Sequence, residues 1–171
     1  MQKIRNVEFE LDTISENDIF ICAIGYEERS RYLLNKLKNF VSHDKILMLY
    51  FDDLRETKEI MTYIEEKRIY GIKTINVKYE QGDDVADLII AFLDGIKDII
   101  GNVYIDYSAM PRSWYSKLPD KISQKLQAEV YFLYVVGDYP CDYKAYPSAG
   151  IDSYSLIGRS SLRDKKRLHI I

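Results

Sequence analysis

The residues best suited to chemistry lie in the segment NVYIDYSAMPRSW, which begins at Asn102. Asp106 and Ser108 follow a short apolar run, and Arg112 comes shortly after them. An arginine near the start of a helix can hold a phosphate in a fork, helped by backbone N–H groups and by a hydroxyl such as that of Ser108 or Ser113. The Asp106 carboxylate can accept hydrogen bonds from ribose hydroxyls or from an exocyclic amine. This spacing favours a phosphate-bearing, nucleotide-like ligand.

A second group of polar residues, GYEERS, spans Gly25 to Ser30 after an apolar run near the start of the chain. Glu27 or Glu28 would supply a carboxylate that attacks an anomeric carbon or activates water there. Aromatic side chains able to stack on a base occur in both groups: Tyr26, Tyr107 and Trp114. The two groups together contain the chemistry that a nucleotide site needs.

The candidate catalytic residues are Arg112, Glu27 and Asp106. The expected ligand contacts come from the same two groups: Gly25, Tyr26, Glu28, Arg29, Ser30, Ser108, Met110, Ser113 and Trp114. A competing interpretation is that the carboxylates only cap helices or neutralise arginines, since acidic residues favour helix N-termini. It applies most strongly to the acidic residues after the other apolar runs: Asp52, Asp53, Asp83, Asp84 and Asp138. No metal site is expected, because the chain has only two histidines.

The polar groups must be positioned by the elements around them. Five apolar runs predict buried strands: Ile19 to Ile24, Ile46 to Phe51, Thr74 to Tyr79, Val103 to Asp106 and Val130 to Val136. Apolar residues at helical spacing predict four helices between them: Leu33 to Val41, Leu54 to Arg68, Val85 to Ile96 and Trp114 to Leu126. Gly71 is expected to stop the second helix, and Asp83 or Asp84 to cap the third. Pro119 is expected to bend the fourth. Short strands are also expected at Val7 to Leu11 and Ser153 to Gly158.

This alternation predicts an α/β fold, a three-layer Rossmann-like domain with a mainly parallel sheet of five to six strands and helices on both faces. The 171 residues are expected to form a single domain, with a core at 18–137 and an irregular extension at 138–171. Ligands of such sheets bind where the strand order reverses, at the carboxyl ends of the strands. If the order reverses between the first and fourth strands, the two polar groups face one crevice.

Composition and missing motifs exclude several classes of protein. The first strand-to-helix turn contains a single glycine, so the fingerprint of NAD and FAD sites is absent, and no Walker A sequence occurs. No cofactor is therefore expected. The net charge of −3 provides no basic field for nucleic acid. Two cysteines without disulfide spacing, and the lack of a signal peptide or membrane span, predict a cytoplasmic protein that does not contact a membrane.

The segment DYSAMPR, residues 106–112, has the form [Asp/Asn]-x-[Ser/Thr]-x-x-x-[Arg/Lys]. With its position after the fourth strand, it resembles the ligand-binding signature of CRISPR-associated Rossmann-fold (CARF) domains. The resemblance implies a homodimer that senses cyclic oligoadenylates in antiviral defence and, in some members, cleaves them as a ring nuclease. It implies that Asp106, Ser108 and Arg112 line the ligand pocket, with residues 25–30 as the second wall. Two departures are the acidic first loop and the lack of an effector domain, so that a sensor would need a protein effector partner.

Three functions follow from these observations. The first is a sensor of a nucleotide second messenger, or a phosphodiesterase of the ring-nuclease kind. The second, favoured by the acidic first loop, is an N-glycosidase or deoxyribosyltransferase-like enzyme that uses Glu27 or Glu28 with Asp106. The third is a non-catalytic interaction module of a defence complex, with its contact surface in the Tyr-rich and basic segments, Cys141 to Tyr146 and Arg163 to Arg167. Carboxylates that face the crevice would indicate an enzyme, and carboxylates that face outward would indicate a sensor.

Overall fold

A computed structural model describes residues 14–37, 41–51, 58–78, 84–96, 101–125 and 128–135 of the chain. All of these residues belong to one compact unit, which ends at Gly137. The elements follow one another in the order β1 (Ile19–Ile24), α1 (Arg29–Leu37), the short 3-10 helix η2 (His43–Lys45), β2 (Ile46–Phe51), α2 (Lys58–Ile69), β3 (Lys73–Val77), α3 (Val85–Asp94), β4 (Val103–Asp106), α4 (Arg112–Tyr115), α5 (Leu118–Lys125) and β5 (Val130–Leu133). The predicted alternation of strands and helices is confirmed.

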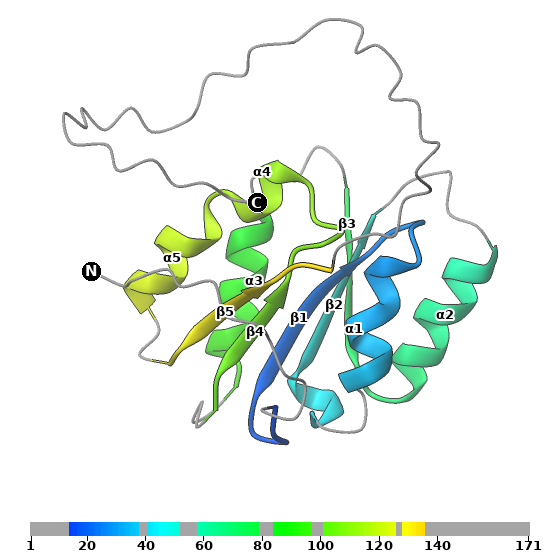
Figure 1. Cartoon of the computed structure of the whole chain (residues 1–171), viewed down its shortest axis with the longest axis horizontal. Coiled ribbons are helices and arrows are strands. Elements are labelled where there is room, and N and C mark those ends of the chain that lie inside the picture. Colours follow the sequence, from blue (N-terminus) through cyan, green and yellow to red (C-terminus); the bar gives the residue numbers. More distant parts are fainter. Residues whose placement is uncertain are drawn as a thin grey trace, which may run out of the picture. The chain divides into compact units, whose positions relative to one another are not determined.

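The strands form one parallel sheet with the order β3-β2-β1-β4-β5 (Figure 1). The predicted Rossmann-like sheet is therefore confirmed, with five strands in the described part of the chain. The chain adds β2 and β3 on one side of β1, and then returns to add β4 and β5 on the other side. The strand order therefore reverses between β1 and β4, which is the position where open parallel sheets bind ligands.

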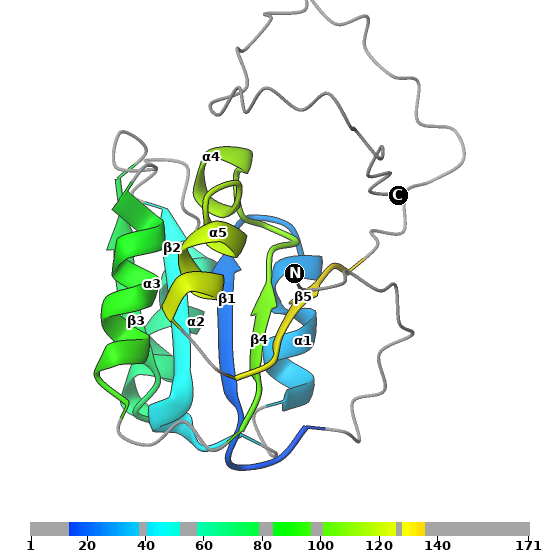
Figure 2. The same ribbon diagram turned by 90° about the vertical axis from the view of Figure 1, so that its left-hand side faces the viewer.

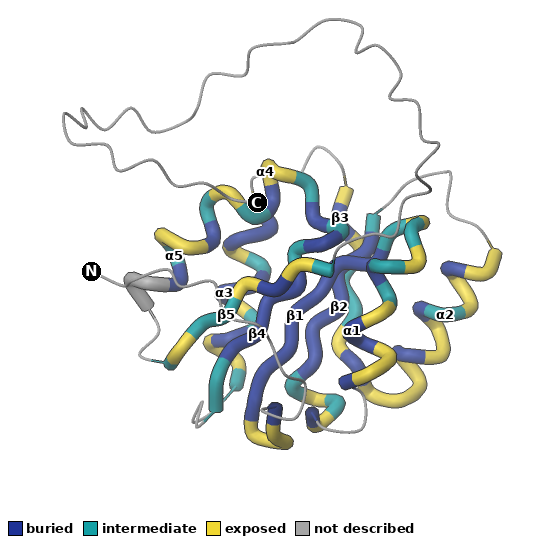
Figure 3. The backbone as a smooth tube through the Cα atoms, in the orientation of Figure 1, coloured by how far each residue is buried: buried dark blue, intermediate teal, exposed yellow. Residues whose placement is uncertain are grey.

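Helices cover both faces of the sheet, so the fold has three layers. α1 and α2 lie on one face, and α3 and α5 lie on the other (Figures 1 and 2). Every residue of β1 is buried, as Figure 3 shows for the centre of the sheet, because neighbouring strands flank it and helices cover both of its faces.

Successive residues of the strands contribute to two cores, one on each face of the sheet. The core under α1 and α2 includes Phe20, Ile24, Leu34, Leu37, Met48 and Ile64. The core under α3, α4 and α5 includes Ile21, Leu49, Ile89, Trp114, Leu118 and Ile122. The side chains that alternate along β1 therefore pack against both layers of helices.

The amino ends of β1 and β4 are fastened together by Asp18. The buried Asp18 carboxylate accepts hydrogen bonds from the backbone N–H groups of Asn102 and Ser15, both at 2.7 Å. Gly101 lies against this contact: a Cβ atom there would stand 2.5 Å from the backbone oxygen of Asn17 and 2.5 Å from Asp18 Oδ1. Only a glycine allows this approach without a shift of the backbone.

The predicted stop signal at Gly71 is confirmed. Gly71 adopts a positive φ of 88°, donates its N–H to the carbonyl of Arg68 at 3.0 Å, and is followed by Ile72, whose N–H bonds the carbonyl of Lys67 at 3.1 Å. This pair of bonds is the Schellman arrangement that closes the C-terminal end of a helix. The buried Ile72 then leads the chain into β3.

The expected single helix from Trp114 to Leu126 is wrong in detail. The chain forms two helices instead, α4 (Arg112–Tyr115) and α5 (Leu118–Lys125), with a break at residues 116–117. Pro119 is the second residue of α5, where its missing N–H has no partner in the helix to lose. The proline therefore begins a new helix rather than bending an existing one.

Other boundaries also differ from the expectation. β5 ends at Leu133 because the N–H of Val135 bonds the Ser108 hydroxyl instead of another strand. Asp84 is the N-cap residue of α3, but its backbone is helical and its side chain makes no capping bond. The expected strands at Val7 to Leu11 and Ser153 to Gly158, and the extension at 138–171, lie outside the described residues. Within the described residues, no helix has both the length and the apolar character needed to cross a membrane.

Candidate functional site

The loops that follow β1 and β4 meet at the carboxyl edge of the sheet. β1 and β4 are paired in register up to Cys22 and Asp106, and each loop leaves its strand within two residues of this pair. A Cβ atom built on Gly25 would lie 3.8 Å from the Cβ of Ala109, which is an ordinary van der Waals contact. The predicted condition is therefore met: the strand order reverses here, and the two polar groups lie side by side.

Asp106 and Ser108 form a buried unit at the end of β4. Ser108 donates its N–H to Asp106 Oδ1 at 2.9 Å, and its hydroxyl donates to the same oxygen at 2.5 Å. The Ser108 hydroxyl in turn accepts the N–H of Val135 at 2.7 Å. The chain after β4 is thus tied to the chain after β5, and the Ser108 hydroxyl is occupied within the protein.

The second oxygen of Asp106 has no such partner. Asp106 is 2% exposed, and its Oδ2 is the buried side-chain oxygen that lacks a hydrogen bond within the described part of the chain. Burial raises the pKa of Asp106, against the hydrogen bonds from Ser108 and the charge of Arg29, which lower it. The pKa of the neighbouring Cys22 thiol is also raised well above its ordinary value. Burial is the larger cause and the charge of Asp106 the smaller one. A buried carboxyl oxygen left unpaired costs about 1–3 kcal/mol.

Arg29 joins the loop after β1 to the end of β5. Its Nε forms an ion pair with the Glu27 carboxylate, and its Nη1 donates to the hydroxyl of Tyr134 at 2.8 Å. The guanidinium carbon also lies 5.6 Å from the centre of the Tyr134 ring. A cation is therefore held close enough to Asp106 to stabilise its charged form, and Glu27 balances that cation on the other side.

Ser30 shapes the loop after β1 rather than presenting its hydroxyl outward. The residue is fully buried, and its hydroxyl donates to the Glu27 carbonyl at 2.6 Å. The same oxygen lies 3.2 Å from the backbone nitrogen and from the carbonyl oxygen of Gly25. The Ser30 side chain was expected to contact a ligand. Its hydroxyl instead bonds the backbone of the loop after β1 and holds that loop in its turn.

Two further expected ligand contacts are core residues. Trp114 is 1% exposed and stacks on Phe51, with 4.4 Å between the ring centres. Met110 is buried in the same core under α3 and α5. Trp114 therefore offers no ring face to a base, and its predicted stacking role is wrong. The spacing of four between Trp114, Leu118 and Ile122 was the sequence signal for this core position.

The remaining predicted residues lie at the surface. Tyr26 is 81% exposed, and Glu28, Arg112 and Ser113 are exposed as well. Among the described residues, the Arg112 side chain forms no ion pair or hydrogen bond. α4 spans only four residues, so the expected helix N-terminus beside Arg112 contributes little dipole, and Arg112 would act through its own charge.

A group of aromatic rings lies beside the site, and only its central member, Tyr107, was identified from the sequence. We call it the aromatic cluster: Tyr107, Tyr115, Phe132 and Tyr134. The Tyr107 ring is central, with its centre 5.1 Å from that of Tyr115, 6.5 Å from that of Phe132 and 5.4 Å from that of Tyr134. The signal was the spacing of two between Phe132 and Tyr134, which places both side chains on one side of an extended chain.

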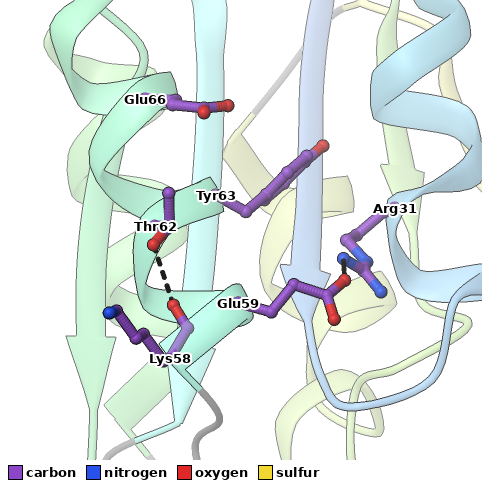
Figure 4. A pocket seen from close by; sticks show the side chains of 6 residues that line it. All are labelled: Arg31, Lys58, Glu59, Thr62, Tyr63 and Glu66. Carbon is purple, nitrogen blue, oxygen red and sulfur yellow. Dashed lines mark hydrogen bonds and ion pairs between the residues drawn. The ribbon is translucent and has the colours of Figure 1, made fainter.

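A separate groove lies between α1 and α2 (Figure 4), with a volume of about 490 Å³. Its lining residues are Arg31, Lys58, Glu59, Thr62, Tyr63 and Glu66. Arg31 pairs with Glu59 at 2.7 Å, and the Tyr63 hydroxyl donates to Asn35 at 2.9 Å. The groove contains none of the candidate site residues at the sheet edge. Arg31, which lines it, directly follows the group from Gly25 to Ser30.

Comparison of the chain with models of protein families finds no match, and comparison with curated proteins finds no relative. Within the described residues, no group of three or more His, Cys, Asp or Glu side chains is arranged to hold a metal ion. The residues of the site supply a buried carboxyl group with one oxygen that has no partner among the described residues, a paired and an exposed arginine, and a partly exposed set of aromatic rings.

Proposed function

We propose that this protein binds a nucleotide, or a second messenger derived from nucleotides such as a cyclic oligoadenylate, at the carboxyl edge of the sheet between β1 and β4. The proposal includes a role in bacterial defence signalling, as the resemblance of residues 106–112 to CARF domains implies. The same resemblance adds a homodimer and a protein effector partner to the proposal.

The observation that supports this proposal most directly is the state of Asp106. Its carboxyl group is buried at the reversal of the strand order, and Ser108 occupies only one of its oxygens. Such a group is costly unless a further donor reaches it. A ribose hydroxyl or an exocyclic amine of a ligand, directly or through a water molecule, provides a donor of the required kind.

The arginines that follow β1 and β4 suit a ligand that carries phosphate. Arg112 is exposed and can pair with a phosphate oxygen at no cost to an existing ion pair among the described residues. Arg29 is already paired with Glu27, so it contributes a weaker net charge. Arg112 is therefore the main phosphate-binding residue in this proposal, and in a ring nuclease it would also stabilise the charged phosphate during cleavage.

The glycosidase alternative receives less support. An attacking carboxylate must be free and must face the sugar. Glu27 is held by Arg29, and Glu28 is exposed at the surface. The raised pKa of Asp106 suits a general acid, and this observation keeps the alternative worth one direct test. A protein that binds its ligand without an attack by Glu27 or Glu28 on the sugar is a sensor rather than a glycosidase, and the positions of both glutamates agree better with a sensor.

Thermal unfolding of the wild-type protein with cyclic tri-, tetra- and hexaadenylate, AMP and ATP tests the proposal. A ligand at one hundred times its Kd adds about 2.7 kcal/mol of stability, which for a domain of this size raises Tm by roughly 5–10 °C. We expect at least one compound to do so in the wild-type protein, and Arg112→Ala to lose the shift while keeping its own Tm. Lys73→Ala is the matched control, since Lys73 is an exposed cation at the start of β3. No shift with any compound would refute the proposal.

A further inference from the structure

The aromatic cluster is partly exposed, although rings of this size usually bury their faces. Tyr134 is 49% exposed and Phe132 is 37% exposed. Both rings contact the half-buried Tyr107, Phe132 edge-on at 62° and Tyr134 tilted at 36°. The result is an exposed apolar surface of two rings that share Tyr107 as their support.

This surface is joined directly to the proposed ligand site by two contacts. Arg29, from the loop after β1, donates to the Tyr134 hydroxyl at 2.8 Å and lies against its ring. The backbone N–H of Val135, next to Tyr134, donates to the same Ser108 hydroxyl that holds Asp106. Tyr134 is therefore positioned by residues on both sides of the site: Arg29 contacts its side chain, and the next residue, Val135, is bonded to Ser108.

From this arrangement we infer that Phe132 and Tyr134 form the surface on which a base of the bound nucleotide stacks. The inference rests on the proposed function and assigns the base to the side of the site next to β5. It replaces the expected stacking on Trp114, which is buried. Stacking on an aromatic ring accepts any base, since every base has a π face. Arg29 beside the ring suits a ligand that carries a negative phosphate next to its base.

The chain offers a matched control for Tyr134. Tyr32, on α1, is 50% exposed, and Lys36 lies over its ring at 5.8 Å. It therefore matches Tyr134 in exposure and in having a cation against the ring. Among the described residues, however, Tyr32 has no hydrogen bond to Asp106, Ser108 or Arg29. A loss that depends only on removing an exposed tyrosine would appear equally in both variants.

The test measures the Kd of cyclic tri-, tetra- and hexaadenylate and AMP for the wild-type protein and for Tyr134→Leu, Tyr134→Phe and Tyr32→Leu. We expect Tyr134→Leu to bind about ten-fold or more weakly. Tyr134→Phe keeps the ring and loses only the bond to Arg29, so its Kd should stay within about three-fold of the wild-type value. Tyr32→Leu should bind as the wild-type protein does. Proton NMR of the bound ligand adds a direct readout: contacts between adenine H8 or H2 and the Tyr134 ring.

Each outcome has one meaning. If the wild-type protein binds none of the four compounds and ATP gives no thermal shift either, the proposed function fails and the inference fails with it. If the wild-type protein binds and Tyr134→Leu binds equally well, only the inference fails. If Tyr134→Phe loses as much affinity as Tyr134→Leu, Tyr134 acts by holding Arg29 and the stacking role is wrong. Should Tyr134→Leu not fold, Phe132→Leu carries the same expectation at the second ring, and unchanged binding there would overturn the inference.

Discussion

Ser108 directs two hydrogen bonds, from its N–H and from its hydroxyl, to the same oxygen of Asp106, and leaves the other oxygen of that buried carboxyl group without a partner among the described residues. One oxygen of the carboxyl group therefore fixes the turn after β4, and the other is buried without a donor in the described part of the chain. Leaving a buried acceptor without a donor is costly.

Replacing Ser108 by alanine should lower the free energy of unfolding by about 1–3 kcal/mol, because Asp106 loses a donor and the N–H of Val135 loses its acceptor in a buried place. Urea unfolding measures the change. Ser113→Ala is the control: Ser113 is exposed, and its loss should change stability by no more than about 0.5 kcal/mol. Equal effects of the two substitutions would contradict the anchoring role of Ser108.

Asp106 should make stability depend on pH in a defined direction. Burial raises its pKa in the folded protein above the ordinary value of 3.8, so the folded state binds the proton more tightly than the unfolded state does. The contribution of this proton binding to the free energy of unfolding is then complete below pH 3.8, and it decreases as the pH rises through the pKa of Asp106 in the folded protein. Asp106→Asn cannot ionise, so the stability of this variant relative to the wild-type protein should increase as the pH rises from about 4. Urea unfolding at several pH values measures this difference, and a constant difference would show that the pKa is not raised.

Trp114 and Tyr26, two of the three aromatic residues first expected to stack on a ligand, should behave in opposite ways. Trp114→Ala should lower the free energy of unfolding by about 3–5 kcal/mol, because it empties a buried site against Phe51. Tyr26→Ala should leave stability within about 0.5 kcal/mol of the wild-type value, since most of its side chain is in water. A stable Trp114→Ala protein would place Trp114 outside the core and reopen its assignment to a ligand.

The two glycines at opposite ends of the β1–β4 pair should also differ. Gly101→Ala forces a Cβ atom to within 2.5 Å of a backbone oxygen, and the resulting shift should cost about 1–3 kcal/mol of stability. Gly25→Ala places its Cβ atom at an ordinary 3.8 Å from Ala109 and should be tolerated. Thermal unfolding of both variants measures the contrast. A strongly destabilised Gly25→Ala protein would mean that the two loops lie closer together than 3.8 Å implies.

Glycosidase activity should be absent. We expect no free base after incubation of the wild-type protein with NAD, nucleosides or nucleoside monophosphates, because Glu27 is engaged by Arg29 and Glu28 lies in solvent. Chromatography of the reaction mixture detects a released base. Release that disappears in Glu27→Gln and persists in Lys73→Ala would reverse the preference between the two functions and make Glu27 the nucleophile or base.

Much of the fold followed from patterns that depend only on neighbouring residues. The continuous apolar runs at Ile19–Ile24 and Ile46–Phe51 predicted β1 and β2 to the residue, because strands covered on both faces tolerate few polar side chains. Gly71 marked the end of α2 for a local steric reason. The position of the site at the carboxyl edge followed from the same alternation of elements once the strand order was known.

The contacts of the site were less predictable, since they depend on which residues the fold brings together. The bond between Arg29 and Tyr134 joins residues 105 positions apart. The sequence identified Arg29 and suggested a carboxylate as its partner, but it gave no indication of Tyr134. Trp114 illustrates the opposite error: an aromatic residue in a polar segment suggested a ligand contact, whereas its spacing from Leu118 and Ile122 decided its burial.

The pairing of β1 with β4 has a consequence for how the protein acquires its site. Asp18 bonds the backbone of Asn102, 84 residues further along the chain, and β2, β3 and the helices between them must be accommodated before this contact closes. Closure of so long a loop is slow relative to local helix formation. During synthesis, β1 and its acidic loop emerge well before Asp106 and Ser108. The candidate site therefore forms only when β4 is inserted beside β1, and a chain that ends before Val103 can contain folded helices but not this site.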